Sequence, residues 1–211
     1  MKITKFTRLA TILEVTLLYV LIQAFIWRWQ FTHPGLAWPL FLFLLSTHVW
    51  HKDTMSILGF RLDNFLPCLK LGMLAFVPFI LVLTFVGLLS GRIWTILGHW
   101  QIVRHALRYI FWATFQQYGL QGYFHHRVMK AISNPMLSSI ISGLIFMSLH
   151  FPNPVLMIFT LLGGFALSVV YSKEPNIFAL GIFHGLIGLW LANSFPREIL
   201  HNMRVGPGYY R

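Results

Sequence analysis

The segment that decides the fold is residues 115–127, FQQYGLQGYFHHR, which places three glutamines within an otherwise apolar stretch of the chain. A primary amide held in hydrocarbon without a hydrogen bond costs about 2–7 kcal/mol, depending on the reference state. Gln116, Gln117 and Gln121 therefore need polar partners from other segments, or they must face a cavity.

The composition of the whole chain is that of a polytopic membrane protein. Of the 211 residues, 57% are hydrophobic, 17% are aromatic and only 10% are charged, which excludes the soluble class. Cys68 is the only cysteine, so an internal disulfide and a multi-cysteine metal site are both excluded. The net charge is +11, but the basic residues stand singly beside apolar runs. This arrangement favours contact with anionic lipid headgroups over nucleic acid.

A transmembrane helix needs about 20 mostly apolar residues. On this template the sequence predicts an all-α transmembrane bundle of six to eight helices, forming one domain over residues 1–211. We expect a multi-pass protein of the cell (plasma) membrane, although its basic residues are divided too evenly between the two sides to set the orientation. The predicted spans are 9–27, 36–50, 66–89, 106–124, 136–150, 155–171 and 176–195.

The runs 36–50 and 136–150 are short for a span, so they suit tilted or re-entrant helices as well as full spans. Pro135 and the Pro152-Asn153-Pro154 turn bracket the second of these runs and predict tight helical hairpins on either side of it. The segments 51–65 and 91–105 mix charged residues with Trp, Ile and Leu, which is typical of the membrane interface.

Small residues recur along one face of the last predicted helix. Their spacing of i, i+4, i+7 and i+11 allows another helix to approach this face closely. We therefore interpret the stripe as a packing surface, made by Gly181, Gly185, Gly188 and Ala192.

Three predicted helices carry amide or imidazole groups at membrane depth. The motifs are Gln116-Gln117-x-x-x-Gln121 on the fourth helix, Phe146-x-x-x-His150 at the end of the fifth and His184-x-x-x-Gly188 in the last. On an α-helix Gln117, Gln121 and His125 would form one stripe. Such groups either stabilise the bundle through interhelical hydrogen bonds or surround a cavity. Because three helices contribute at one depth, the sequence favours a site.

The order and spacing of these motifs resemble the CAAX protease and bacteriocin-processing family of membrane endopeptidases, which includes the type II CAAX prenyl endopeptidases. The pattern of that family is Glu-Glu-x-x-x-Arg, then Phe-x-x-x-His, then His-x-x-x-Asn or Asp, each on its own helix. The corresponding segments here read QQYGLQG, FMSLH and HGLIG. LGFRLD at 58–63 and GYF after the first motif add to the resemblance, which covers the second half of the chain well and the first half loosely.

The resemblance implies a membrane-embedded peptidase site at positions Gln116, Gln117, Gln121, His150 and His184, and we expect no cofactor and no metal there. In the family the first Glu, here Gln116, is taken as the general base that activates water, and the first His assists it. The positions of His184 and Gly188 are thought to bind the water or hold the oxyanion. Here both Glu are Gln, the Arg is Gln and the Asn is Gly. A buried negative charge and its cationic partner are thus removed together, which keeps the electrostatics balanced.

An amide cannot act as a general base near neutral pH, so the sequence leaves two functions open. One is an endopeptidase acting on membrane-anchored or C-terminal peptides, in which His150 and His184 orient or deprotonate water and Gln116 donates to an oxyanion. The other is a catalytically inactive relative that binds such a peptide as an immunity, chaperone or partner-stabilising protein. A transporter or channel would call for charges along a path or inverted repeats, and the sequence shows neither.

The other ionisable residues are interpreted as structural. Glu14 is the only acid within a predicted span, and we expect it to pair with a Lys, Arg or His. His125-His126-Arg127 is interpreted as the basic, interfacial end of a helix, as are His48 and His51. The adjacent His125 and His126 point to different faces of a helix and no carboxylate or thiolate joins them, which argues against a metal site.

Overall fold

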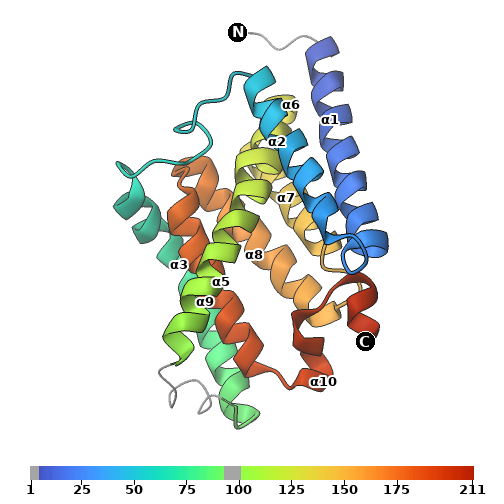
Figure 1. Ribbon diagram of the computed structural model, residues 1–211. Helices are drawn as coiled ribbons and strands as arrows, with labels where there is room; N and C mark the ends of the chain where they lie inside the picture. Colours follow the sequence, from blue (N-terminus) through green and yellow to red (C-terminus); the bar gives the residue numbers. More distant parts are fainter. Residues whose placement is uncertain (1–4, 93–100) are drawn as a thin grey trace.

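The computed structural model describes residues 5–92 and 101–211. Within these ranges the chain is an all-α bundle, as the sequence predicts (Figure 1). Residues 93–100, which belong to the predicted interfacial segment 91–105, lie outside the described residues. The other predicted interfacial segment forms turns and irregular backbone between the second and third helices.

Each of the predicted spans coincides with a helix. The α-helices are α1 (Lys5–Ala24), α2 (Ala37–Trp50), α3 (Phe65–Leu89), α5 (Gln101–Gln117), α6 (His126–Ile132), α7 (Pro135–Ser148), α8 (Pro154–Lys173), α9 (Ile177–Ser194) and α10 (Arg197–Leu200). A π-helix at Phe25–Trp29 extends α1, and a second one at Tyr118–His125 joins α5 to α6. Short 3-10 turns occur at Pro34–Leu36, His201–Met203 and Gly206–Tyr210.

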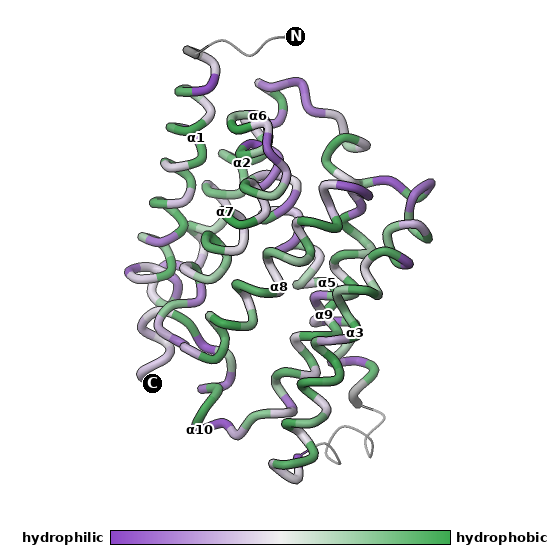
Figure 2. The backbone as a smooth tube through the Cα atoms, turned by 180° about the vertical axis from the view of Figure 1, so that it is seen from behind, coloured by the Kyte–Doolittle hydropathy of each residue, from purple (hydrophilic) through white to green (hydrophobic). Residues whose placement is uncertain are grey.

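Four helical segments of the described chain are long and apolar enough to cross a membrane. They are Thr7–Trp29, Phe65–Leu89, Pro154–Lys173 and Ile177–Ser194. The apolar helices Pro34–Trp50 and Pro135–Ser148 are shorter, in agreement with the sequence prediction for these two runs. Figure 2 shows the long apolar tracts along the helices and the polar residues concentrated in the connections.

Asparagine side chains cap the first turns of α7, α8 and α9. Each accepts a hydrogen bond from a backbone N–H in the first turn, and a proline follows two of them at the first helical position, where no N–H partner is needed. The donor–acceptor distances are 3.0 Å for Leu137 N to Asn134 Oδ1, 3.1 Å for Leu156 N to Asn153 Oδ1 and 3.0 Å for Ala179 N to Asn176 Oδ1. The helix boundaries predicted from the prolines are therefore confirmed.

The small-residue stripe brings α9 directly against α5. A Cβ atom at Gly181 would lie 2.0 Å from Thr114 Oγ1, and one at Gly185 would lie 2.7 Å from the Cα atom of Ile110. Since no larger residue could occupy either position without moving α5, the predicted packing role of the stripe is confirmed. His184 lies between these glycines and is thereby carried to α5.

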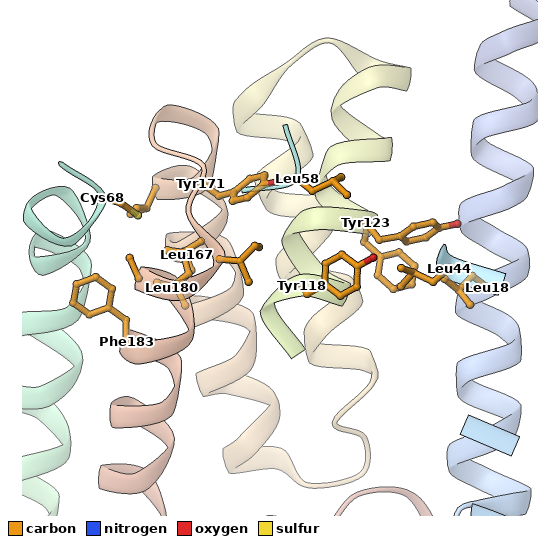
Figure 3. Packing of buried hydrophobic residues seen from close by; sticks show 14 residues of the cluster. Leu18, Leu44, Leu58, Cys68, Tyr118, Tyr123, Leu167, Tyr171, Leu180 and Phe183 are labelled. Carbon is orange, nitrogen blue, oxygen red and sulfur yellow. The ribbon is translucent and has the colours of Figure 1, made fainter. Parts of the chain in front are cut away.

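The principal apolar core joins the two halves of the chain around the second π-helix (Figure 3). Tyr118 and Tyr123 of that π-helix belong to a cluster that also contains residues of α1, α2, α8 and α9. Other buried members of this cluster are Leu18, Leu44, Leu58, Leu167, Tyr171, Leu180 and Phe183. This packing holds Gln117, the residue before the π-helix, at a fixed depth in the bundle.

The segment after α9 folds back across the end of the bundle at which α1 ends (Figure 1). Gly206 N donates to Phe151 O at 2.9 Å, and Gln30 Nε2 donates to Val205 O at 3.3 Å. Asn153 Nδ2, beyond its capping role, donates to Leu200 O at 2.7 Å. These bonds hold residues 202–205, termed the C-terminal strap, against the helices.

Candidate functional site

A cavity of about 460 Å³ lies between α5, α7, α8, α9 and the C-terminal strap. Gln116, Gln117, His150 and His184 all line it, and they come from three separate parts of the fold: the end of α5, the turn after α7 and the middle of α9. Apolar side chains, among them Phe146, make up most of the remaining wall. The structure thus brings together four of the five residues that the motifs identify.

Gln117 and His184 are hydrogen-bonded to each other across the α5–α9 contact. Gln117 Nε2 lies 3.0 Å from His184 Nδ1, and the Gln117 side chain is fully buried. An amide nitrogen can only donate, so Nδ1 accepts and the imidazole is neutral with its proton on Nε2. Gln117 Oε1 has no hydrogen-bond partner among the described residues. The cavity wall therefore carries a buried acceptor whose bonding capacity is unused.

Phe146 orders both imidazoles. Its backbone oxygen accepts a hydrogen bond from His150 Nδ1 at 2.6 Å, which leaves Nε2 of a neutral His150 as an acceptor. The Phe146 ring meets the His150 ring edge to face at a centroid distance of 4.6 Å, and it meets the His184 ring in the same manner at 5.4 Å. The Phe-x-x-x-His spacing thus places an apolar ring beside the two histidines and fixes the tautomer of the first.

Gln121 does not reach the cavity. It is fully buried, its Oε1 atom accepts a hydrogen bond from Ser168 Oγ at 3.0 Å, and its Nε2 atom has no partner among the described residues. The predicted stripe of Gln117, Gln121 and His125 does face inward, since all three side chains are buried, but its members meet different helices. Gln117 bonds to His184 of α9, whereas Gln121 and His125 both contact α8, where Ser172 Oγ lies 2.8 Å from His125 Nε2. His125 Nδ1 also lies 3.0 Å from Ser142 Oγ of α7.

A second polar cluster, termed the ionic cluster, lies at the opposite end of the bundle. Arg127 is fully buried there, donating to Glu14 Oε1 at 3.0 Å and to Asp53 Oδ2 at 2.6 Å. Lys130 Nζ donates to Asp53 Oδ1 at 2.6 Å. The cluster consists of Glu14, His48, His51, Asp53, His126, Arg127 and Lys130.

These contacts overturn the interfacial interpretation of His125-His126-Arg127 and of His48. Arg127, His125 and His48 are all buried. Glu14 and Asp53 compensate Arg127, Asp53 contacts His48, and two serine hydroxyls satisfy His125. The expected pairing of Glu14 is confirmed, since it contacts His51 Nε2 at 2.6 Å as well as Arg127. A buried ion pair is tolerated when its members have several hydrogen bonds, as they do here.

Asp53 is the centre of the ionic cluster. Burial by itself would raise the pKa of its carboxyl group, but hydrogen bonds from His48, Lys130 and Arg127 outweigh burial and hold that pKa well below its usual range. The carboxylate is therefore charged at neutral pH, as the neighbouring cations require. It ties the connection after α2 to α6.

No carboxylate lines the cavity in the described part of the chain, which contains all five acids of the sequence. Glu14 and Asp53 belong to the ionic cluster, and Asp63 pairs with Arg61. Asn64 Nδ2 donates to Glu174 at 3.3 Å, and Glu198 is exposed on α10. Among residues 5–92 and 101–211, no group of three or more His, Cys, Asp or Glu is placed to hold a metal ion.

Several cavity residues have no counterpart in the sequence motifs. They are Tyr109 and Trp112 on α5, Gln30 and Phe31 after α1, and Asn202 to Val205 in the C-terminal strap. Tyr109 could have been found, because it lies eight residues before Gln117 and thus on the same face of α5. The strap could not, because only its hydrogen bonds to residues far away in the sequence bring it to the cavity.

Residues 98–190 match the family model described as type II CAAX prenyl endopeptidase Rce1-like. No curated protein and no solved structure matches the chain. The matched range contains all three motifs, so the resemblance to the CAAX protease family is confirmed. Together with the four long apolar helices of the described chain, this match indicates an integral membrane protein whose residues 98–190 are similar to the type II CAAX prenyl endopeptidases.

Proposed function

We propose that this protein binds a peptide segment of a membrane-anchored protein in the cavity and does not hydrolyse it. The observation that carries the proposal is the Gln117 amide, which bonds to His184 and keeps an unpartnered acceptor in a cavity without a carboxylate. A multi-pass arrangement in the cell membrane would place this cavity beside lipids and lipid-anchored partners.

The absence of a carboxylate base from the cavity argues against efficient hydrolysis. A positioned general base contributes about 10²–10⁴ to the rate, and neither Gln116 nor Gln117 can accept a proton near neutral pH. His184 Nδ1 is occupied by the Gln117 amide, and His150 Nδ1 by the Phe146 carbonyl. The remaining amide and imidazole atoms suit the recognition of a ligand, because they can donate or accept hydrogen bonds without carrying a charge.

The chemistry of the wall fits a peptide. A peptide backbone alternates N–H donors and C=O acceptors, and each needs a partner when it leaves water. Gln117 Oε1 and His150 Nε2 are hydrogen-bond acceptors, whereas the Gln116 amide has both a donor and an acceptor atom. The surrounding apolar residues, such as Leu156 and Phe159, suit hydrophobic side chains or a lipid chain on the ligand.

A second candidate is a histidine-based endopeptidase. The observation that favours it is the tautomer of His150, whose Nδ1–H is held by a backbone carbonyl, which leaves Nε2 of this cavity residue as an acceptor. This is the arrangement in which an imidazole acts as a general base. His150 would then activate the water, and Gln116 would donate to the oxyanion.

Binding and cleavage of a prenylated CAAX peptide by the purified protein in lipid nanodiscs separate the two functions. We expect the unmodified protein to bind without turnover, and Gln116→Glu/Gln117→Glu/Gln121→Arg to acquire turnover. His184→Ala should weaken binding, whereas His105→Ala, an exposed position on α5, should not. Turnover by the unmodified protein that resists chelators and is lost in His150→Ala would establish the endopeptidase instead. Absence of binding by the unmodified protein would refute both functions for this ligand.

A further inference from the structure

Tyr109 lies on the cavity wall at a position that none of the three motifs contains. It belongs to α5, lines the cavity, and faces Gly188 of α9 across the close helix contact. A Cβ atom at Gly188 would lie 2.3 Å from Tyr109 Cε1 and 2.7 Å from Tyr109 Oη. The phenol therefore occupies the space that any side chain at position 188 would take.

The hydroxyl group of Tyr109 has only a weak partner. It donates to Met203 Sδ at 3.9 Å, and a thioether sulfur is a poor acceptor. Met203 belongs to the C-terminal strap and lines the same cavity. A ligand oxygen entering between α5 and the strap would accept from Tyr109 Oη in place of the thioether, and would gain a stronger hydrogen bond.

We propose that Tyr109 Oη is the hydrogen-bond donor for a backbone carbonyl of the bound peptide, and that it works together with Gln117 Oε1 as the acceptor for a backbone N–H. This inference rests on the proposed function. The two residues are eight apart on one face of α5, which corresponds to about 12 Å along a helix. An extended chain advances about 3.3 Å per residue, so the two groups match an extended peptide of about three to four residues.

This geometry also places the two ends of the bound segment. Tyr109 contacts the strap through Met203, whereas Gln117, eight residues further along α5, bonds to His184 in the middle of α9. The peptide would therefore run along the α5–α9 contact from the strap toward His184. Its carbonyl at the strap would bond to Tyr109, and its N–H at the other end would bond to Gln117.

Tyr109→Phe tests the proposal, because it keeps the ring against Gly188 and removes only the hydroxyl. In nanodiscs, the prenylated CAAX peptide should bind roughly 3- to 10-fold more weakly, the range expected for one neutral hydrogen bond. Thermal unfolding should be unchanged. Tyr19→Phe is the matched control, since the Tyr19 hydroxyl bonds to Ser148 Oγ at 2.9 Å and Tyr19 does not line the cavity, so affinity should be retained.

A swapped pair of residues gives a second, independent readout. Gly188→Asn alone should abolish binding, because the added side chain meets the phenol. Tyr109→Ala/Gly188→Asn should bind more tightly than Tyr109→Ala, because an amide donor then occupies the vacated space from α9. Wild-type affinity in Tyr109→Phe, or no gain from the swap, would overturn the proposal while leaving peptide binding intact. If the unmodified protein binds no peptide, the proposed function fails and the role of Tyr109 fails with it.

Discussion

In the described part of the chain, Gln117 and Gln121 each have one amide atom without a hydrogen-bond partner, an acceptor on the first and a donor on the second. The CAAX protease pattern has a carboxylate and a guanidinium at these positions. A charged pair so deeply buried is stable only while both members are present, because one charge left alone keeps its full desolvation cost. Two neutral amides avoid this cost but leave the hydrogen bonding incomplete.

We therefore expect Gln117→Glu alone to lower the free energy of unfolding by about 3–5 kcal/mol, the typical cost of an uncompensated buried charge. Gln117→Glu/Gln121→Arg should recover a large part of that loss, because the guanidinium supplies the missing partner. Thermal or denaturant unfolding in one detergent, arranged as a double-mutant cycle, measures the coupling. Additive losses in the double variant would show that residues 117 and 121 do not interact.

At the scale of single elements, the contact between α5 and α9 positions the candidate site. Gly181, Gly185 and Gly188 let the two helices approach until Thr114, Ile110 and Tyr109 fill the space that side chains would need. The same approach brings His184 Nδ1 within 3.0 Å of the Gln117 amide. The close packing of α5 against α9 therefore sets the geometry of the candidate site.

Gly185→Ala should disturb the packing and the site geometry together. Its methyl group would lie 2.6 Å from Ile110 Cγ1 and 2.7 Å from the Cα atom of Ile110, so the backbone of α5 must move. We expect a loss of about 1–3 kcal/mol in unfolding free energy, together with weaker peptide binding. Gly163→Ala is the control for stability, because a Cβ at Gly163 meets nothing within 4 Å. Equal stability of the two variants would contradict this account of the helix pair.

At the scale of the whole molecule, the cavity and the ionic cluster lie toward opposite ends of the bundle. The C-terminal strap lines the cavity and bonds to Gln30, just after α1, whereas the ionic cluster joins α1, the connection after α2 and α6. Figure 1 shows α6 and α10 toward opposite ends of the bundle. The π-helix Tyr118–His125 joins α5, which ends at Gln117, to α6, which carries Arg127. The cluster thereby holds the far end of the helix that supplies Gln116 and Gln117.

Thiol labelling from the two sides of a membrane tests this arrangement. Cys68 is the only cysteine and is fully buried, so the unmodified protein should not react. A membrane-impermeant reagent should label Arg204→Cys, at the cavity, from one side and Ser56→Cys, after α2, from the other. A bound peptide should protect only Arg204→Cys. Labelling of both variants from the same side would contradict the placement of the cavity and the ionic cluster at opposite ends of the bundle. The side of the membrane from which Arg204→Cys is labelled gives the orientation of the protein.

The sequence alone determined the helices and much of the candidate site. Apolar run lengths predicted the spans, prolines predicted where two of the helices begin, and the small-residue stripe predicted a close helix contact. These features depend on residues within one or two helical turns, where the pattern directly reflects the geometry. The order of the three short motifs was sufficient to identify Gln116, Gln117, His150 and His184, which line one cavity.

Only the tertiary structure decided which polar groups meet. Arg127 finds Glu14 across 113 positions of the chain and Asp53 across 74, and no local pattern records such a choice of partner. Gln121 bonds to Ser168 of α8 and does not line the cavity, although the helical repeat places it beside Gln117. Tyr109 and the C-terminal strap become part of the cavity through packing against Gly188 and bonds to distant backbone. Burial makes each of these pairings necessary, because a polar group removed from water must be satisfied by whatever the fold brings beside it.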